Sequence, residues 1–196
     1  MTPPPFGPVL FRDRDRPMPI FRFLRRRQAD DAASALYSAV VTQARQPAFY
    51  SDLGVADTLE GRYDMVILHA YMIFRRLALM GNDRSRHLAQ QTFDLMFTDM
   101  DRNLREMGVT DTGVGKRIRR MAEAFYGRAT AYDRALDAPG RGLQEALGRN
   151  LFQGQPVNPE HEDRMASYLR VQLDYLATQS DAALLAGEVT FSAMEA

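Results

Sequence analysis

Two segments decide the fold of this chain: Phe93-Asp-Leu-Met-Phe-Thr-Asp-Met-Asp-Arg-Asn-Leu-Arg-Glu-Met-Gly-Val109 and, directly after it, Asp111-Thr-Gly-Val-Gly-Lys-Arg-Ile-Arg-Arg-Met121. Large apolar side chains recur in them and just beyond at helical spacing: Phe93, Phe97, Met100, Leu104, Met107, then Val114, Ile118, Met121, Phe125 and Tyr132. Gly108 suits a helix C-terminus that needs positive φ, and Asp111 suits the N-cap of the next helix. The pattern predicts an antiparallel helical hairpin from about Arg84 to Leu136, closed on an apolar seam.

Basic side chains of the same segments lie outside the predicted seam. They are Arg102 and Arg105 on the first helix and Lys116, Arg117, Arg119 and Arg120 on the second. Cations early in a helix oppose its macrodipole, so we expect another interaction to offset the cost of the four on the second helix. Two interpretations are open: they pair with acids of the preceding helix, or they bind an anion or a partner protein.

Tyr126-Gly127-Arg128 places a glycine inside the second helix, where it costs about 1 kcal/mol relative to alanine. Either another helix packs tightly against this backbone, or the side chain of a partner docks in the notch. On the partner interpretation, the predicted binding residues are Arg102, Arg105, Lys116, Arg117, Arg119, Arg120, Tyr126, Gly127 and Arg128.

The rest of the chain is also typical of helices. Apolar spacing predicts them at about 30–46, 61–80, 143–151 and 160–186, the second being the most buried, and Phe49 and Tyr50 after Pro47 are expected to plug the core. No segment alternates with period two. The predicted fold class is all-α: a single compact domain of about six helices at residues 30–186, with the hairpin at its centre and a tail at 187–196.

The first 29 residues are rich in proline and arginine and are predicted to be disordered. Within them, one short aromatic and basic stretch could instead rest weakly on an anionic membrane surface through Phe21, Phe23, Leu24, Arg25, Arg26 and Arg27. Prolines and acids interrupt the region where a secretory signal would lie. The longest apolar run, Met65–Phe74, is far shorter than the ~20 residues that span a bilayer.

Composition excludes several kinds of chemistry. The chain has no cysteine, which excludes disulfides and thiolate nucleophiles, and its formal net charge of +0 gives no general attraction to nucleic acid. Its three histidines form no paired metal motif, and His69 is expected to be a core residue. Gly113-Val-Gly-Lys116 is not a phosphate loop, because Thr110 and Arg117 stand where glycine and Ser or Thr are needed. We predict no metal, no cofactor and no catalytic residue.

The two opening segments with Phe125-Tyr-Gly-Arg128 and Tyr132 after them resemble the ubiquinol–cytochrome c reductase chaperone family, as do Leu36-Tyr37, Ala44-Arg-Gln-Pro-Ala-Phe-Tyr50 and Gly61-Arg-Tyr-Asp64 upstream. The similarity covers roughly residues 34–178 and is strongest over 93–132. It implies an all-helical, non-catalytic assembly factor that holds newly made cytochrome b and, in mitochondria, works with a small partner protein near the ribosome. It further implies a place in the bacterial cytoplasm at the inner membrane, or in the mitochondrial matrix of a eukaryote.

Two other functions are compatible with the sequence. In the first, the Gly108 turn acts as a helix-turn-helix, and the arginine-rich helix 112–138 contacts the phosphates of a nucleic acid or the ribosome. The neutral overall charge argues against it. In the second, the helices enclose a small-molecule pocket of an enzyme, which would require a cofactor that the sequence does not indicate.

Overall fold

The computed structural model describes residues 21–152 and 158–193, with side chains from Asp31 onward except that of Thr112. Within these ranges the chain forms helices and no strand. The helices are α1 (Phe21–Ala44), α2 (Ala48–Ser51), α3 (Leu59–Leu79), α4 (Asp83–Glu106), α5 (Asp111–Asp137), α6 (Gly142–Asn150), α7 (Pro159–Thr178) and α8 (Asp181–Leu185). Six of them have nine residues or more, which confirms the prediction of an all-α domain of about six helices.

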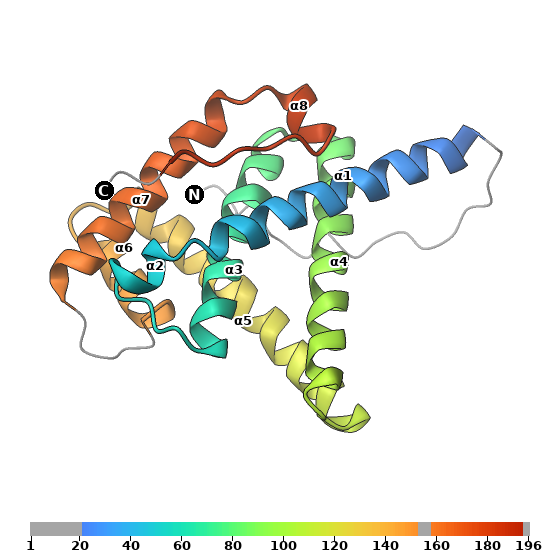
Figure 1. Ribbon diagram of the computed structural model, residues 1–196. Helices are drawn as coiled ribbons and strands as arrows, with labels where there is room; N and C mark the ends of the chain where they lie inside the picture. Colours follow the sequence, from blue (N-terminus) through green and yellow to red (C-terminus); the bar gives the residue numbers. More distant parts are fainter. Residues whose placement is uncertain (1–20, 153–157, 194–196) are drawn as a thin grey trace.

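Helix α3 is the centre of the core. Twelve of its residues are buried, and α1, α4 and α7 all pack against it. In Figure 1, α1 crosses α3 and α4, and α7 lies along the opposite side of the molecule from the α4–α5 turn. The apolar run Met65–Phe74, in which His69 is the one polar interruption, explains this position, because a helix that is apolar around its circumference is stable only when other helices surround it. The prediction that this helix is the most buried is confirmed.

The segment after α1 closes one end of the core. Helix α1 ends at Ala44 ahead of Pro47, and Phe49 of α2 is completely buried. Its ring packs edge-on against His69 at 5.3 Å and against Tyr168 of α7 at 5.0 Å between centroids. Such aromatic contacts add to the stabilisation from burial. Phe49 therefore plugs the core, as the sequence predicts, whereas Tyr50 is only partly buried and packs against the edge of the core.

Side-chain caps fix where several helices begin. Thr58 accepts a hydrogen bond from the Gly61 amide (3.1 Å), and Asn82 accepts one from the Ser85 amide (2.9 Å). Ser180 accepts one from the Ala183 amide (3.1 Å) and so starts α8. The prediction of one helix over 160–186 is wrong for this reason: the backbone is extended at Gln179, and a new helix begins after Ser180.

Helices α4 and α5 meet at a tight turn and diverge from it, as Figure 1 shows at the lower right. Their apolar stripes converge on α3 rather than on each other alone. The ring of Phe74 on α3 lies 6.1 Å from that of Phe93 on α4 and 5.6 Å from that of Phe125 on α5. Phe93 and Phe125 are also 5.6 Å apart. Phe93 and Phe125 of the predicted stripes thus belong to an aromatic cluster that three helices share.

The backbone of α1 is helical from Phe21, whereas the sequence pattern predicts a start near Asp30. The stretch proposed to touch a membrane, Phe21, Phe23, Leu24, Arg25, Arg26 and Arg27, has its side chains outside the described part of the structure, and residues 1–20 lie outside it altogether. Contact with a membrane surface through these residues stays a prediction. No helix among the described residues has the length and apolar character needed to cross a bilayer.

Candidate partner-binding surface

The turn between α4 and α5 has the geometry of a Schellman motif. Gly108 has φ +82°, its amide donates to the Arg105 carbonyl (2.9 Å), and the Val109 amide donates to the Leu104 carbonyl (3.1 Å). This confirms the predicted role of Gly108. The prediction that Met107 is buried in the apolar stripe is wrong: half of it (51%) is exposed, because α4 ends at Glu106 and Met107 is the C-cap at the turn.

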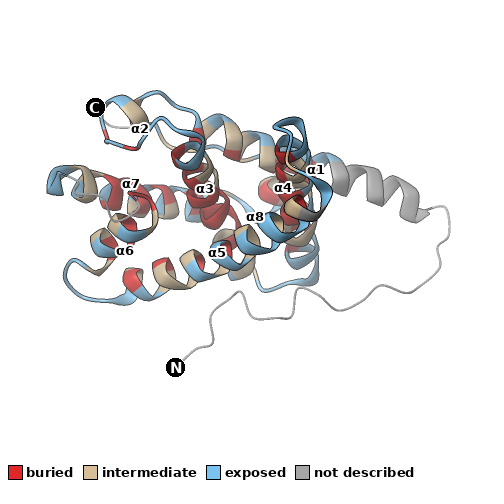
Figure 2. Ribbon diagram, turned by 90° about the horizontal axis from the view of Figure 1, so that it is seen from below, coloured by how far each residue is buried: buried red, intermediate tan, exposed pale blue. Residues whose placement is uncertain are grey.

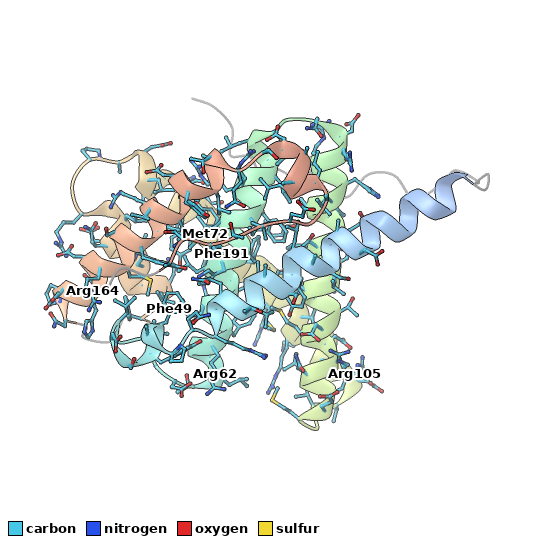
Figure 3. All side chains as sticks on the ribbon, turned by 45° about the horizontal axis from the view of Figure 1, so that its top comes forward. Phe49, Arg62, Met72, Arg105, Arg164 and Phe191 are labelled. Atoms are coloured by element: carbon cyan, nitrogen blue, oxygen red, sulfur yellow. The ribbon has the colours of Figure 1, made fainter. Side chains whose placement is uncertain are left out.

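Two of the predicted binding cations are engaged within the chain. Arg102 pairs with Asp99 one turn before it, and Arg105 pairs with Asp101 (2.6 Å) and with Asp111 across the turn. Figure 3 labels Arg105 at this end of the molecule. The prediction that Asp111 is an N-cap is wrong. Thr110 holds that position, and the Asp111 carboxylate pairs with Arg105 instead. These pairs are exposed, and pairs of this kind contribute little to stability.

Arg128 and Tyr126 are turned toward the core. Arg128 donates to Asp64 of α3 at 2.5 Å, and the Asp64 side chain is only 3% exposed. The Tyr126 ring stacks on Phe93 with centroids 5.7 Å apart, and its hydroxyl is buried. Burial, with a smaller contribution from Asp94, raises the pKa of Tyr126. Both residues therefore join α5 to its neighbours, and neither presents a free polar group on the outer face.

The other four cations form what we call the basic row: Lys116, Arg117, Arg119 and Arg120. All four are exposed, and no ion pair to any of them occurs among the described residues. Figure 2 shows a largely exposed outer side along α5. The interpretation that the row pairs with acids of the preceding helix is therefore not supported, because no such pair occurs among the described residues, and Asp99 and Asp101 of α4 pair with Arg102 and Arg105 instead.

The position of the basic row within α5 also removes the expected conflict with the helix dipole. The helix begins at Asp111, so its first turn carries an acid, and Lys116 comes only in the second turn. The dipole effect falls off within the first turn of a helix. The row consequently needs no internal compensation and leaves its charge available at the surface.

Gly127 lies on the exposed side of α5, next to residues that face inward. A Cβ atom built there would meet nothing within 4 Å. The explanation that another helix packs tightly against this glycine is therefore wrong. What remains is an open stretch of helix backbone, one α-helical turn or more beyond the basic row.

The residues upstream that carry the family resemblance hold the helices together. Tyr37 of α1 donates to Asp99 of α4 (2.9 Å), and Asp64 receives Arg128. A Cβ atom at Gly61 would lie 2.0 Å from the Ala56 carbonyl oxygen, so only glycine fits there. These positions form the scaffold, and the surface features lie on α5 and at the turn before it.

One arrangement was not predicted from the sequence. Gln172 of α7 and Gln179, the residue that follows α7, hydrogen-bond to the backbone of Ser192 and Thr190, beyond α8. The only local signal is the seven-residue spacing of the two glutamines, which places them on one side of a helix. That spacing is common by chance, so the contact with a later segment could not be foreseen.

The described part of the chain contains no candidate metal site. No group of three or more His, Asp or Glu side chains with metal-site geometry occurs there. His69 is fully buried, its Nδ1 donates to the Met65 carbonyl (2.7 Å), and its Nε2 accepts from the Tyr168 hydroxyl (2.7 Å). Burial lowers the pKa of His69 to about 4, so the ring is neutral. This confirms the prediction that it is a satisfied core residue.

Comparison with known proteins identifies the family. Residues 51–191 match the model of the ubiquinol-cytochrome C chaperone family. The crystal structure of the Cbp3 homolog from Brucella abortus is similar, with a TM-score of 0.77 and 36% identity over 90% of this chain and 98% of that one. Ubiquinol-cytochrome-c reductase complex assembly factor 1 of Xenopus laevis is 27% identical over 161 residues, 82% of this chain and 80% of the relative.

A more distant relative is the protein named CBP3, mitochondrial, of Saccharomyces cerevisiae, which is 26% identical over 146 residues. These residues are 73% of this chain but only 44% of the yeast protein, and the corresponding share of the human assembly factor is 54%. The chain thus spans about half the length of some relatives. The match over most of its own length, with an all-helical fold at TM-score 0.77, shows that the chain belongs to the ubiquinol–cytochrome c chaperone family, whose members are assembly factors of ubiquinol–cytochrome c reductase.

Proposed function

We propose that this protein is a non-catalytic assembly factor that binds cytochrome b while ubiquinol–cytochrome c reductase is being assembled. The observation that carries the proposal is the family match across residues 51–191, together with 36% identity to the Cbp3 homolog from Brucella abortus. The proposed place of action is the cytoplasmic side of a bacterial inner membrane, or the matrix side of the mitochondrial membrane if the source is a eukaryote.

The basic row is the proposed site for a protein partner. Its four cations are exposed on one helix, and no ion pair to them occurs among the described residues, while the nearby Asp101 and Asp111 are engaged by Arg105. Met107 adds an exposed apolar side chain at the same end of α5, and Gly127 leaves the helix backbone open further along. A row of positive charge with apolar contacts at its end suits an acidic face on a small helical partner protein.

Deleting the gene tests the assembly role. The expected result is a loss of assembled cytochrome b, measured from its haem absorbance in isolated membranes, with restoration by the full-length gene. Normal levels of assembled cytochrome b in the deletion strain would refute the proposal. Other respiratory complexes in the same membranes serve as the control for a general defect.

Two double variants, each lacking two arginine charges, test the basic row. The variant Arg117→Gln/Arg120→Gln is compared with Arg84→Gln/Arg134→Gln, which removes two exposed arginines at the start of α4 and the far end of α5. Exposed substitutions of this kind change stability by only about 0.5 kcal/mol, so both variants should fold. We expect only the first to lose partner proteins that co-purify with the wild type from the native host.

The same variants address the nucleic-acid alternative. An exposed row of guanidinium groups also suits phosphates, and such binding falls steeply as salt concentration rises. If the wild type retains RNA at low salt and the Arg117→Gln/Arg120→Gln variant does not, while its protein partners are unchanged, the row serves RNA or the ribosome. Loss of the protein partners without any RNA binding supports the assignment made above.

A further inference from the structure

The segment 188–193 follows α8 and runs back along α7, as Figure 1 shows in dark red. Two glutamines, one within α7 and one directly after it, bind the backbone of this segment. The side chain of Gln172 accepts from the Ser192 amide (2.8 Å) and donates to the Ser192 carbonyl (2.9 Å). Gln179 does the same with Thr190, at 3.1 and 2.7 Å. All four bonds go to main-chain atoms, so they recognise an extended chain whatever its sequence.

The residue between these two positions supplies an apolar anchor. Phe191 packs edge-on against His69 of α3, with ring centroids 5.3 Å apart, and is labelled in Figure 3. Successive side chains of an extended chain point to opposite sides. The two paired residues, Thr190 and Ser192, can therefore present their backbone to α7 while Phe191 reaches the core. The arrangement packs one aromatic side chain against α3 and binds its two neighbours through their backbone.

Gln172 matches a peptide backbone, because its side-chain amide both donates and accepts a hydrogen bond here. Its side chain is completely buried, and Ser192 engages both its amide nitrogen and its amide oxygen. A buried amide left without hydrogen bonds is strongly unfavourable. If residues 188–193 depart, another extended chain or water must take their place.

The surface beside the segment continues the apolar character of the site. Val171 and Tyr175 of α7 are 46% and 38% exposed, and their spacing puts them on one side of the helix. The Tyr175 hydroxyl lies 3.3 Å from the Thr190 hydroxyl, so this surface adjoins the segment. A longer peptide bound in place of the segment would find apolar contacts here.

We propose that Gln172, Gln179 and His69 form a peptide clamp, that residues 188–193 are its built-in occupant, and that an extended apolar segment of an unfolded protein, carrying an aromatic residue, binds by displacing them. The exchange breaks no covalent bond and leaves α1 to α7 in place, because the segment follows the last helix. This binding activity goes beyond the proposed function, since it depends on peptide chemistry and not on the identity of the client.

The test uses the full-length protein and a fluorescein-labelled peptide with the sequence of residues 188–193. In the wild type the built-in segment competes with the peptide, so the apparent Kd is raised by the inverse of the open fraction. The variant Phe191→Ala weakens the segment without changing the clamp. We expect it to bind the peptide about tenfold more tightly than the wild type in fluorescence anisotropy, by that same relation.

Two controls distinguish specific binding at the clamp from non-specific binding of the peptide. A peptide with alanine in place of the aromatic residue should bind the Phe191→Ala protein much more weakly. The double variant Gln172→Leu/Phe191→Ala, which keeps a side chain of similar size without the amide, should lose the labelled peptide while its circular dichroism stays helical. Equal binding of both peptides, or binding that survives Gln172→Leu, would overturn the proposal.

A second variant tests the proposal if Phe191→Ala does not fold stably. Ser192→Pro removes the amide that donates to Gln172 but keeps the aromatic anchor. Hydrogen exchange at Thr190 reports whether the segment has left. If it has left and no labelled peptide binds, the clamp is not a peptide site. If it stays in place in both variants, residues 188–193 are a fixed part of the fold and the proposal is wrong. Neither result bears on whether the protein assembles cytochrome b, which the gene deletion measures.

Discussion

Acidification should destabilise this protein through one buried histidine. His69 lies in the core and is linked through Tyr168 of α7 to Gln43 of α1, whose side-chain amide donates to the Tyr168 hydroxyl at 3.0 Å. The ring donates through one nitrogen and accepts through the other, an arrangement that only neutral imidazole provides. Protonation would replace the acceptor with a second donor and place a charge in the core. Burial therefore lowers the pKa of His69 to about 4, from 6.5 in a model compound.

The size and sign of the effect follow from this pair of values. Between pH 6.5 and 4 the unfolded chain binds a proton that the folded protein excludes, so the stability contributed by neutral His69 is complete above pH 6.5 and is lost as the pH falls toward 4. At 1.36 kcal/mol per pKa unit, the full loss is about 3 kcal/mol, of which about 2 kcal/mol falls between pH 7.5 and 5.

Urea unfolding at pH 7.5 and pH 5 measures the loss. Wild type is compared with His69→Gln, which offers a donor and an acceptor but cannot be protonated, and with His87→Gln, which removes an exposed histidine. Carboxylates contribute to the pH dependence of all three proteins equally, so the difference between variants isolates the histidine. We expect His69→Gln to lose about 2 kcal/mol less than the other two. The same loss in all three proteins would refute the assignment of a neutral buried ring.

Three further changes test the packing. Gly127→Ala should raise the free energy of unfolding by about 0.5–1 kcal/mol, because the added methyl meets no atom and helix propensity improves; a decrease on thermal unfolding would mean that something packs there. Gly61→Ala should lower it by about 1–3 kcal/mol, since its Cβ would overlap the Ala56 carbonyl, and an unchanged melting temperature would contradict that contact. Phe49→Ala should cost about 3–5 kcal/mol in urea unfolding, whereas a loss below about 1 kcal/mol would show that the ring does not plug the core.

Local sequence was sufficient for the helices whose pattern is complete within one segment. The burial of Phe93, Phe97 and Leu104 follows from their spacing, because helical geometry puts side chains three or four residues apart on one face. The left-handed turn at Gly108 follows from the lack of a side chain there. The interruption at Gln179 was missed, since a serine cap inside an otherwise helical pattern is a weak signal.

The candidate site was only partly predictable. Arg105, Arg128 and Arg119 look alike in the sequence, yet the first pairs at the surface, the second pairs with a buried acid, and the third has no ion pair among the described residues. Which arginine meets a carboxylate depends on how neighbouring helices are placed. Sequence spacing within one helix cannot give that placement, because it arises from packing between helices.

By itself, then, the sequence determined an all-helical chain, its most buried helix, the turn at Gly108 and its chaperone family. Each of these depends on local periodicity or on motifs within single segments. Only the tertiary structure decided which cations stay unpaired on α5 and which backbone Gln172 holds. The glutamine and Ser192 are 20 residues apart, and the chain must reverse direction after α8 before they can meet. Contacts of that kind depend on the packing of all the helices at once, which no single segment encodes.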